Sequence, residues 1–304
     1  MSKIAFAVHG GASNSYPFLK KNLKEYEEGL AEAAQAGYKI LRRGGSALNA
    51  VEEGVKVLED NPIFNAGRGS ALNCQGEIEM DASIMDGKTL KAGAVSMVRS
   101  VKNPISLARI ITYKTKHVFL SGYGALEVAR NEGIYLEADS YFYTDHMQEI
   151  FRKLSKHETI QKIMEKKIYG TVGAVALDRR GNLAAGTSTG GTSNCLPGRI
   201  GDSCVIGAGC YANNKTCAVS GTGEGEYLIR GVIAHTISMM VELKQMGMQE
   251  ACDYVLHKRH NNRRGHIGVI AINAAGEIGI SFNTPIMKRA WISADEPLQV
   301  KIFP

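Results

Sequence analysis

The chain lacks most features that mark secreted, membrane-spanning or zinc-binding proteins. No apolar run approaches the length that crosses a bilayer, and the first residues turn polar too soon for a signal peptide. The six cysteines form no Cys-x-x-Cys pair, and the four between positions 195 and 217 fit no zinc spacing. We therefore expect a cytoplasmic protein with free, mostly buried thiols and no membrane association.

Dense basic clusters with aromatic residues are also scarce. The net charge of +6 comes from scattered residues, and the one dense group, Lys258–His260 with Arg263 and Arg264, has no interleaved aromatic residue. This pattern favours a solvated helix end, and we expect no nucleic-acid partner. Glycine is abundant at 34 residues, many in short runs, which indicates tight turns and close backbone approaches.

Apolar periodicity and turn signals predict two halves, each with strands and a pair of helices, joined by a polar surface arm at about 137–167. In the first half we expect strands at 3–8 and 92–98 and helices at about 23–41, 46–58 and 104–116. In the second half we expect strands at 172–177, 183–188, 205–210, 216–220, 266–273, 277–282 and 289–293 and helices after 226 and at 248–258. Sheets covered by helices, an α+β layered architecture, would follow.

The centre of this organisation is Gly170-Thr171-Val172, where a small apolar strand begins directly after the polar arm. A cut before Thr171 would free an α-amino group with a pKa of about 7.7–8.0 beside the threonine hydroxyl. Amine and hydroxyl on one residue are a known way to activate threonine as a nucleophile. By itself, Gly-Thr-Val favours the plainer interpretation, a strand that merely begins with threonine.

Other polar residues with candidate roles stand in glycine-rich segments. Hydroxyls at Thr189 and Thr222 could orient a Thr171 nucleophile or donate to an oxyanion, with Asn65 as a second donor. Arg199 offers a planar fork for a carboxylate and Asp202 a counter-charge for an ammonium, which describes a pocket for an amino-acid head group. The alternative is an ion pair that closes their own loop.

Three further features have competing interpretations. His9 could be an orienting imidazole, but we favour a histidine satisfied within a turn. His235 shares one face of a predicted helix with apolar residues, which favours a core histidine. The run Gly221–Gly225 precedes a helix like a phosphate cradle, yet it lacks the following Lys-Ser or Lys-Thr and the dinucleotide spacing.

Taken together and in order, seven motifs resemble those of the plant-type asparaginase / isoaspartyl peptidase family of N-terminal-nucleophile hydrolases. They cover nearly the whole chain and begin at His9-Gly10-Gly11-Ala12, Phe64-Asn65-Ala66-Gly67, Glu79-Met80-Asp81-Ala82, Gly170-Thr171-Val172-Gly173, Thr187-Ser188-Thr189-Gly190, Gly198-Arg199-Ile200-Gly201 and Gly221-Thr222-Gly223-Glu224. The departures are Cys204, where proline is common, and the variable stretch Ser193–Cys195. These departures affect the loop shape more than a proposed catalytic group.

The resemblance implies a four-layer αββα sandwich of one domain, 1–304. It also implies autoproteolysis between Gly170 and Thr171, giving an α subunit, 1–170, whose linker spans about 137–170, and a β subunit, 171–304. Two αβ units would pair. The implied substrates are L-asparagine and β-aspartyl dipeptides, with a glycosylasparaginase-like amidase or a non-cleaving amino-acid-binding homologue as alternatives.

The resemblance also implies a role for each candidate residue. Thr171 would be the nucleophile, held by Thr189, with Thr222 and Asn65 forming the oxyanion hole. Arg199 would bind the substrate carboxylate, and Asp202 with the carbonyls of Gly223 and Gly225 would bind its ammonium. No cofactor would be needed for catalysis. A structural sodium ion would be held by main-chain carbonyls of Leu58, Glu59, Asn61, Phe64, Ala66 and Arg68.

Overall fold

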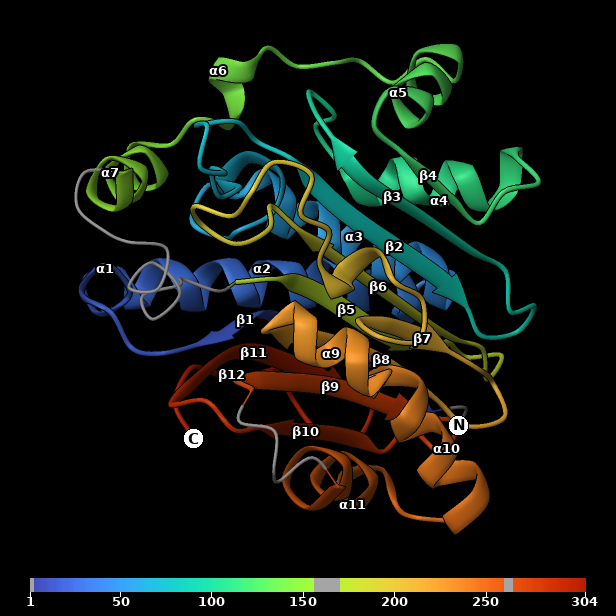
Figure 1. The fold of residues 1–304 in the computed structure, drawn as a ribbon. Helices are drawn as coiled ribbons and strands as arrows, with labels where there is room; N and C mark the ends of the chain where they lie inside the picture. Colours follow the sequence, from blue (N-terminus) through green and yellow to red (C-terminus); the bar gives the residue numbers. More distant parts are fainter. Residues whose placement is uncertain (1–2, 156–169, 260–264) are drawn as a thin grey trace.

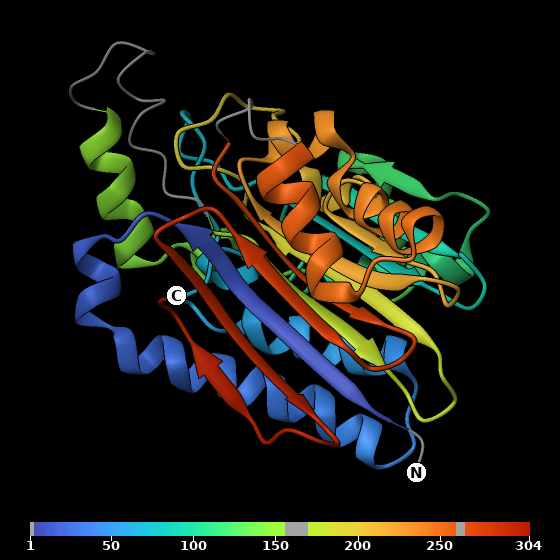
Figure 2. The ribbon, with the colours of Figure 1, turned by 90° about the horizontal axis from the view of Figure 1, so that it is seen from below.

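Four layers, in the order helix, sheet, sheet, helix, make up the fold (Figure 1), and the predicted α+β sandwich is confirmed. The computed structural model describes residues 3–155, 170–259 and 265–304. Seen from below, α2 (Leu23–Arg42) lies on one side of the paired sheets, and α10 (Ile233–Lys244) and α11 (Met248–Asp253) lie on the other (Figure 2).

The described strands form two sheets. The larger has the order β12-β11-β1-β5-β6-β2-β3-β4 and is antiparallel except between β3 and β4. Its strands are β1 (Ala5–Ser13), β2 (Met80–Asp86), β3 (Ala92–Val98), β4 (Phe119–Ser121), β5 (Val172–Leu177), β6 (Leu183–Thr189), β11 (Ile286–Ser293) and β12 (Gln299–Lys301). The smaller, antiparallel sheet has the order β10-β9-β8-β7, with β7 (Cys210–Ala212), β8 (Cys217–Gly223), β9 (Ile267–Asn273) and β10 (Ile278–Phe282).

Helices cover the outer face of each sheet. The larger sheet carries α2, α3 (Ala47–Asp60) and α4 (Pro104–Lys114), and further along the chain come α5 (Gly122–Asn131), α6 (Asp139–Phe142) and α7 (Asp145–Ser155). A short α1 (Pro17–Lys21) precedes α2. The smaller sheet carries α9 (Gly225–Gly231), α10 and α11, which continues as π-helical turns over Tyr254–Arg259.

The first apolar layer forms because two glycines leave room for one aromatic ring. Phe6 of β1 is fully buried under α2 and α3. A Cβ on Gly37 of α2 would lie 2.2 Å from the Phe6 ring, and one on Gly54 of α3 would lie 2.6 Å from it. Helix α3 begins at a conventional cap, because Ser46 Oγ accepts the Asn49 N–H at 3.2 Å. These contacts fix how both helices lie on the sheet.

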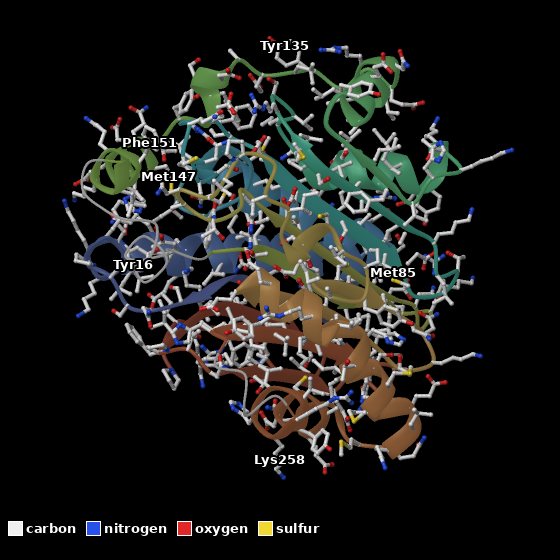
Figure 3. All side chains as sticks on the ribbon, in the orientation of Figure 1. Tyr16, Met85, Tyr135, Met147, Phe151 and Lys258 are labelled. Carbon is white, nitrogen blue, oxygen red and sulfur yellow. The ribbon has the colours of Figure 1, made fainter. Side chains whose placement is uncertain are left out.

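Small side chains fill the layer between the two sheets. Seven of its fifteen buried residues are alanines, and the others include Val175, Ile270 and Met287. Met85 of β2 also belongs to this layer, where its sulfur accepts the N–H of Ala212 on β7 (Figure 3). The sheets therefore approach closely enough for short polar side chains to reach across.

The helix predicted after residue 226 differs from the structure. It breaks at Val232, whose backbone is left-handed at φ 46°, so α9 and α10 are separate helices. The buried face of α10 is formed by Ile233, Ala234, Ile237 and Met240, while Val232 and Leu243 are exposed. The prediction of one continuous apolar face was wrong. His235 is half-buried and packs edge-to-face on Tyr211.

Two strand predictions also need correction. Residues 205–210 were predicted as a strand, but the strand is β7 at Cys210–Ala212. The sequence pattern predicts no strand at Met80–Asp86, yet this segment is β2, an interior strand of the larger sheet. Its residues are buried on both faces, so the alternation that identifies a half-exposed strand is absent.

The described part of the polar arm contains two helices, α6 and α7. Met147 of α7 is buried and Phe151 half-buried (Figure 3), so this part of the arm packs on the protein. The remainder of the predicted linker, residues 156–169, lies outside the described residues. All six cysteines are free and four are buried, as expected. Among the described residues, no helix is long and apolar enough to cross a membrane.

Glu59, near the end of α3, ties three elements together. Its Oε1 accepts the Ser188 hydroxyl of β6 at 2.6 Å and the Ile105 N–H of α4 at 3.0 Å. Its Oε2 is buried and has no hydrogen-bond partner within the described residues. Burial therefore raises the pKa of Glu59 to about 8, despite the two hydrogen bonds.

Gly37→Ala should destabilise the protein, although Gly-to-Ala in a helix normally stabilises by about 0.5–1 kcal/mol. The new methyl group would collide with the Phe6 ring, and overpacking of this kind costs about 1–3 kcal/mol. Gly124→Ala in α5 is the matched control, because a Cβ there meets nothing within 4 Å. Denaturant unfolding should show a lower unfolding free energy for Gly37→Ala and a higher one for Gly124→Ala than for the parent protein. Stabilisation by Gly37→Ala would contradict the packing described.

Glu59→Gln should flatten the pH dependence of stability. The folded pKa is about 8, above the 4.5 usual for a glutamate, so the folded state binds more protons between these values and stability falls as pH rises. Gln keeps the Oε1 acceptor and cannot ionise. It should therefore remove the loss of unfolding free energy at high pH, which is of the order of a few kcal/mol. Unfolding free energies of both proteins from pH 5 to pH 8 check this linkage. Parallel curves would contradict it.

Candidate active site

Thr171 lies at the start of β5, next to the end of β6. It is buried, and its hydroxyl donates to Thr189 Oγ1 at 3.3 Å. The antiparallel pairing of β5 with β6 places Val172 opposite Ser188, which brings Thr189 beside Thr171. Thr189 Oγ1 also accepts the Gly191 N–H at 3.1 Å. The structure thus brings the two predicted hydroxyls into direct contact.

An irregularity in strand β1 between His9 and Ala12 lies against the Gly170–Thr171 peptide bond. Gly11 has φ +105°, and a Cβ there would lie 2.7 Å from Gly170 Cα and 3.3 Å from Thr171 N. Ala12, the next residue, donates its N–H to Thr222 Oγ1 at 3.2 Å, so Thr222 of β8 also contacts this part of β1. Only glycine combines this conformation with so close an approach.

Asn65 lies on the other side of the same bond. A Cβ on Gly170 would lie 3.3 Å from Asn65 Cβ. The Asn65 side chain is held at both ends, because Nδ2 donates to Gly191 O at 2.7 Å and Oδ1 accepts the Ala71 N–H at 2.8 Å. One N–H of the amide group therefore has a partner in the loop after Thr189, which fixes the direction of the second.

A second cluster contains Arg199, Asp202 and Gly225. A Cβ on Gly225 would lie 2.8 Å from Asp202 Oδ1 and 2.9 Å from Arg199 Nη2, so both charged groups converge on the space that glycine leaves. Arg199 Nε donates to Glu226 Oε1 at 3.1 Å. Asp202 Oδ2 is buried and has no hydrogen-bond partner in the described part of the chain. The two side chains do more than close their own loop, since they line one cradle.

The charge state of Asp202 follows from its burial. Burial raises the pKa of Asp202 to about 7, and the Arg199 guanidinium opposes that rise. Asp202 Oδ1 faces the space at Gly225, where a ligand ammonium would place a positive charge beside the carboxylate. The role of the Gly223 carbonyl in binding that ammonium stays a prediction. Gly223, at φ +120°, lets β8 approach His266 of the neighbouring segment.

Asp81 connects the two clusters, a position to which the sequence assigned no role. It pairs with Thr189 in the β2–β6 register, and its carboxylate accepts the N–H groups of Gly201 at 3.0 Å and Met97 at 3.1 Å. It therefore holds the loop of Arg199 and Asp202 against the strand that ends at Thr189. An acidic residue in a run of small residues was the signal in the sequence.

His9 contradicts the expectation of a histidine satisfied within a turn. It is a residue of β1, fully buried, and its ring nitrogens bond to Thr171 O and Ser220 Oγ, both at 2.9 Å. These partners lie 162 and 211 residues away along the chain. Sequence patterns carry no information on such long-range contacts, so this role was missed.

The predicted sodium loop follows the end of α3. Pro62 has no N–H for the Leu58 carbonyl, and the Ile63 N–H donates instead to Asn61 Oδ1 at 3.2 Å. The chain then turns back, so that a Cβ on Gly67 would lie 2.4 Å from Glu59 O. Carbonyl oxygens at the end of α3, which lack the N–H donors of a continuing helix, therefore lie close to the segment at Gly67. Oxygen donors of this type fit a hard cation.

Comparisons with known proteins agree with this geometry. The family model described as asparaginase matches residues 2–302. The isoaspartyl peptidase of Escherichia coli K12 is 41% identical over 300 residues, which cover 96% of this chain and 93% of that protein. The isoaspartyl peptidase/L-asparaginase of Mus musculus is 46% identical over 274 residues, covering 90% and 83% of the two chains, and that of Homo sapiens is 44% identical over 270 residues, covering 89% and 87%. The resemblance seen in the motifs is confirmed, and the chain belongs to the asparaginase family.

Proposed function

We propose that this protein is a threonine-nucleophile amidohydrolase that releases aspartate from L-asparagine and from β-aspartyl dipeptides. The observation that carries the proposal is the Thr171–Thr189 hydroxyl pair, joined through Asp81 to a cradle of opposite charges at Arg199 and Asp202. The relatives' names, isoaspartyl peptidase and L-asparaginase, support the same substrates.

Activation would begin with cleavage of the chain itself. Thr171 Oγ attacks the Gly170 carbonyl carbon, the peptide C–N bond breaks, and the Thr171 amine forms while Gly170 is held as an ester. Water then hydrolyses this ester, leaving pieces of 1–170 and 171–304. The close approach of Gly11 and Asn65 to Gly170 supports this step, because the bond lies between rigid neighbours that fix its geometry.

Turnover would use the new amine as the base. The amine takes the Oγ proton, Oγ attacks the side-chain carbonyl of the substrate, and ammonia or an amino acid leaves with a proton from the ammonium. Thr222 and Asn65 would donate to the oxyanion, and losing one such donor typically costs about 2.7–4 kcal/mol. Water then hydrolyses the acyl-enzyme and releases aspartate.

Recognition of the α-carboxylate and α-ammonium groups would fall to the cradle. Arg199 would bind the carboxylate through two parallel N–H groups, and Asp202 Oδ1, which faces the cradle, would accept from the ammonium. A glycosylasparaginase-like amidase would use the same groups on a glycosylated asparagine. A binding protein would need the cradle alone, whereas the buried hydroxyl pair at Thr171 and Thr189 supports catalysis.

Three further features belong to the proposal. The main-chain carbonyls after α3, from Leu58 to Arg68, would hold a structural sodium ion, which supplies no catalytic chemistry. Two cleaved units would pair, and their mass under native conditions would test this. The free cysteines support a reducing, cytoplasmic setting.

Thr171→Ala should remain a single full-length chain and lose turnover by at least about a thousandfold, because both proposed steps use Oγ. Thr171→Ser keeps a hydroxyl and should cleave and turn over measurably. Intact mass, N-terminal sequencing and assays with L-asparagine, a β-aspartyl dipeptide and a glycosylated asparagine report both steps and the substrate class. Unchanged turnover by Thr171→Ala would rule out this mechanism.

Substrate affinity should depend on pH through Asp202. Its pKa of about 7 means that the free site loses its negative charge as pH falls below 7, so the ammonium binds less well. We expect KM to rise about tenfold from pH 8 to pH 6, and kcat to fall separately as the Thr171 amine, with its pKa of about 7.7–8.0, is protonated. Asp202→Asn should show a high KM that is flat across this range. A flat KM in the parent protein would contradict the assignment.

A further inference from the structure

Behind Thr171, a chain of polar groups crosses from the smaller sheet to the larger one. Thr187 Oγ1 lies 2.7 Å from Ser220 Oγ, Ser220 Oγ lies 2.9 Å from His9 Nε2, and His9 Nδ1 lies 2.9 Å from Thr171 O. Thr187 and His9 come from β6 and β1 of the larger sheet, and Ser220 comes from β8 of the smaller one. All three side chains are fully buried.

The partners determine where each proton lies. The Thr171 carbonyl can only accept, so His9 Nδ1 carries a proton and donates it. In the neutral ring, Nε2 is then an acceptor, and the Ser220 hydroxyl donates to it. Because Ser220 donates its one proton to His9, it can only accept from Thr187, whose hydroxyl is shared between Ser220 and the Gly209 carbonyl. The bonds from Ser220 to His9 and from His9 to Thr171 therefore both point towards the carbonyl of Thr171.

The ring is neutral for a physical reason. Burial lowers the pKa of His9 to about 3, and the nearby charge of Lys288 acts in the same direction. A neutral imidazole with this fixed tautomer cannot take up a proton at Nε2 near neutral pH. It can, however, hold a carbonyl in place without changing charge during a reaction.

The packing leaves this chain of groups no freedom to move. A Cβ on Gly173 would lie 2.0 Å from Ser220 Oγ and 2.5 Å from His9 Nε2, so the neighbouring strand fits only because residue 173 has no side chain. Thr187 is also within 2.9 Å of Gly209 O, and Ser220 within 3.3 Å of Gly186 O. The donors are therefore fixed before any substrate arrives.

We propose that His9 is a positioning residue for the nucleophile: the chain Thr187–Ser220–His9 fixes the Thr171 carbonyl, so that Oγ1 faces first the Gly170 carbonyl and then the substrate. The proposal rests on Thr171 being the nucleophile. His9 touches neither the scissile bond nor the Arg199–Asp202 cradle in any contact within the described residues. Its loss should therefore affect the rates of both reactions and leave substrate binding unchanged.

The test compares His9→Asn with His9→Gln, since each amide replaces one ring nitrogen. Asn places an N–H where Nδ1 stands and can donate to Thr171 O, whereas Gln reaches the position of Nε2 and Ser220. We expect His9→Asn to self-cleave and turn over within about fivefold of the parent protein. His9→Gln and His9→Ala should slow both steps by about tenfold or more, with KM for a β-aspartyl dipeptide nearly unchanged.

A second pair of buried hydroxyls provides the control. Thr216 Oγ1 and Ser238 Oγ lie 2.6 Å apart beneath α10, and neither residue has a contact with the site in the described structure. Ser238→Ala should lower the melting temperature without slowing either step, whereas Ser220→Ala should slow both. The measurements are the rate of fragment formation by intact mass, kcat and KM of the cleaved fraction, and thermal unfolding.

Two results would overturn the proposal. Equal slowing by Asn, Gln and Ala, together with a raised KM and a lower melting temperature, would show that His9 only supports the fold. Parent-like rates in all three variants would show that the Thr171 carbonyl needs no support. Failure of the proposed function would look different, because Thr171→Ala would then turn over whatever the His9 variants do.

Discussion

The close approach of the two sheets is the constraint on which the site depends. Alanines make up nearly half of the buried residues between them, and glycine stands where a side chain would collide with the other sheet, as at Gly173 against Ser220. At this spacing a histidine on one sheet reaches a serine on the other without a water molecule between them. A layer of leucines would separate the sheets by more than such side chains can span. The choice of small residues is therefore part of the active site as much as of the core.

The register of the strand pairs places the other residues of the site next to one another. In the larger sheet, β5 beside β6 brings Thr171 to Thr189, and β6 beside β2 brings Thr189 opposite Asp81. Asp81 then holds the backbone of Gly201, within the loop of Arg199 and Asp202. A one-residue slip in either pairing would reverse the faces on which these side chains stand. Two adjacent hydrogen-bonded ladders thus position both the Thr171–Thr189 pair and the loop that carries Arg199 and Asp202.

Motifs in the sequence predicted the layered fold and the candidate residues better than periodicity predicted the elements. The Thr171–Thr189 contact and the convergence of Arg199 and Asp202 fall on residues chosen from the sequence. Periodicity did not predict strand β2, because both of its faces are buried. It did not predict the helix break at Val232, because nothing local requires a left-handed residue there. The partners of His9 and Asp81 were not predicted, because they depend on contacts between distant segments. Sequence patterns report local preference, whereas these residues act through tertiary contacts.

The strand order has a consequence for the proposed cleavage before Thr171. In the larger sheet, β12 and β11 belong to residues after 170, β1 to residues before it, β5 and β6 to those after it, and β2, β3 and β4 to those before it. Two pieces cut at this bond would therefore be interleaved within one sheet and would share three internal ladders, β11–β1, β1–β5 and β6–β2. They could separate only by breaking these central ladders, so the cut protein would stay together. Each piece made alone would expose unpaired strand edges that invite aggregation, so the proposed cleavage would have to follow folding.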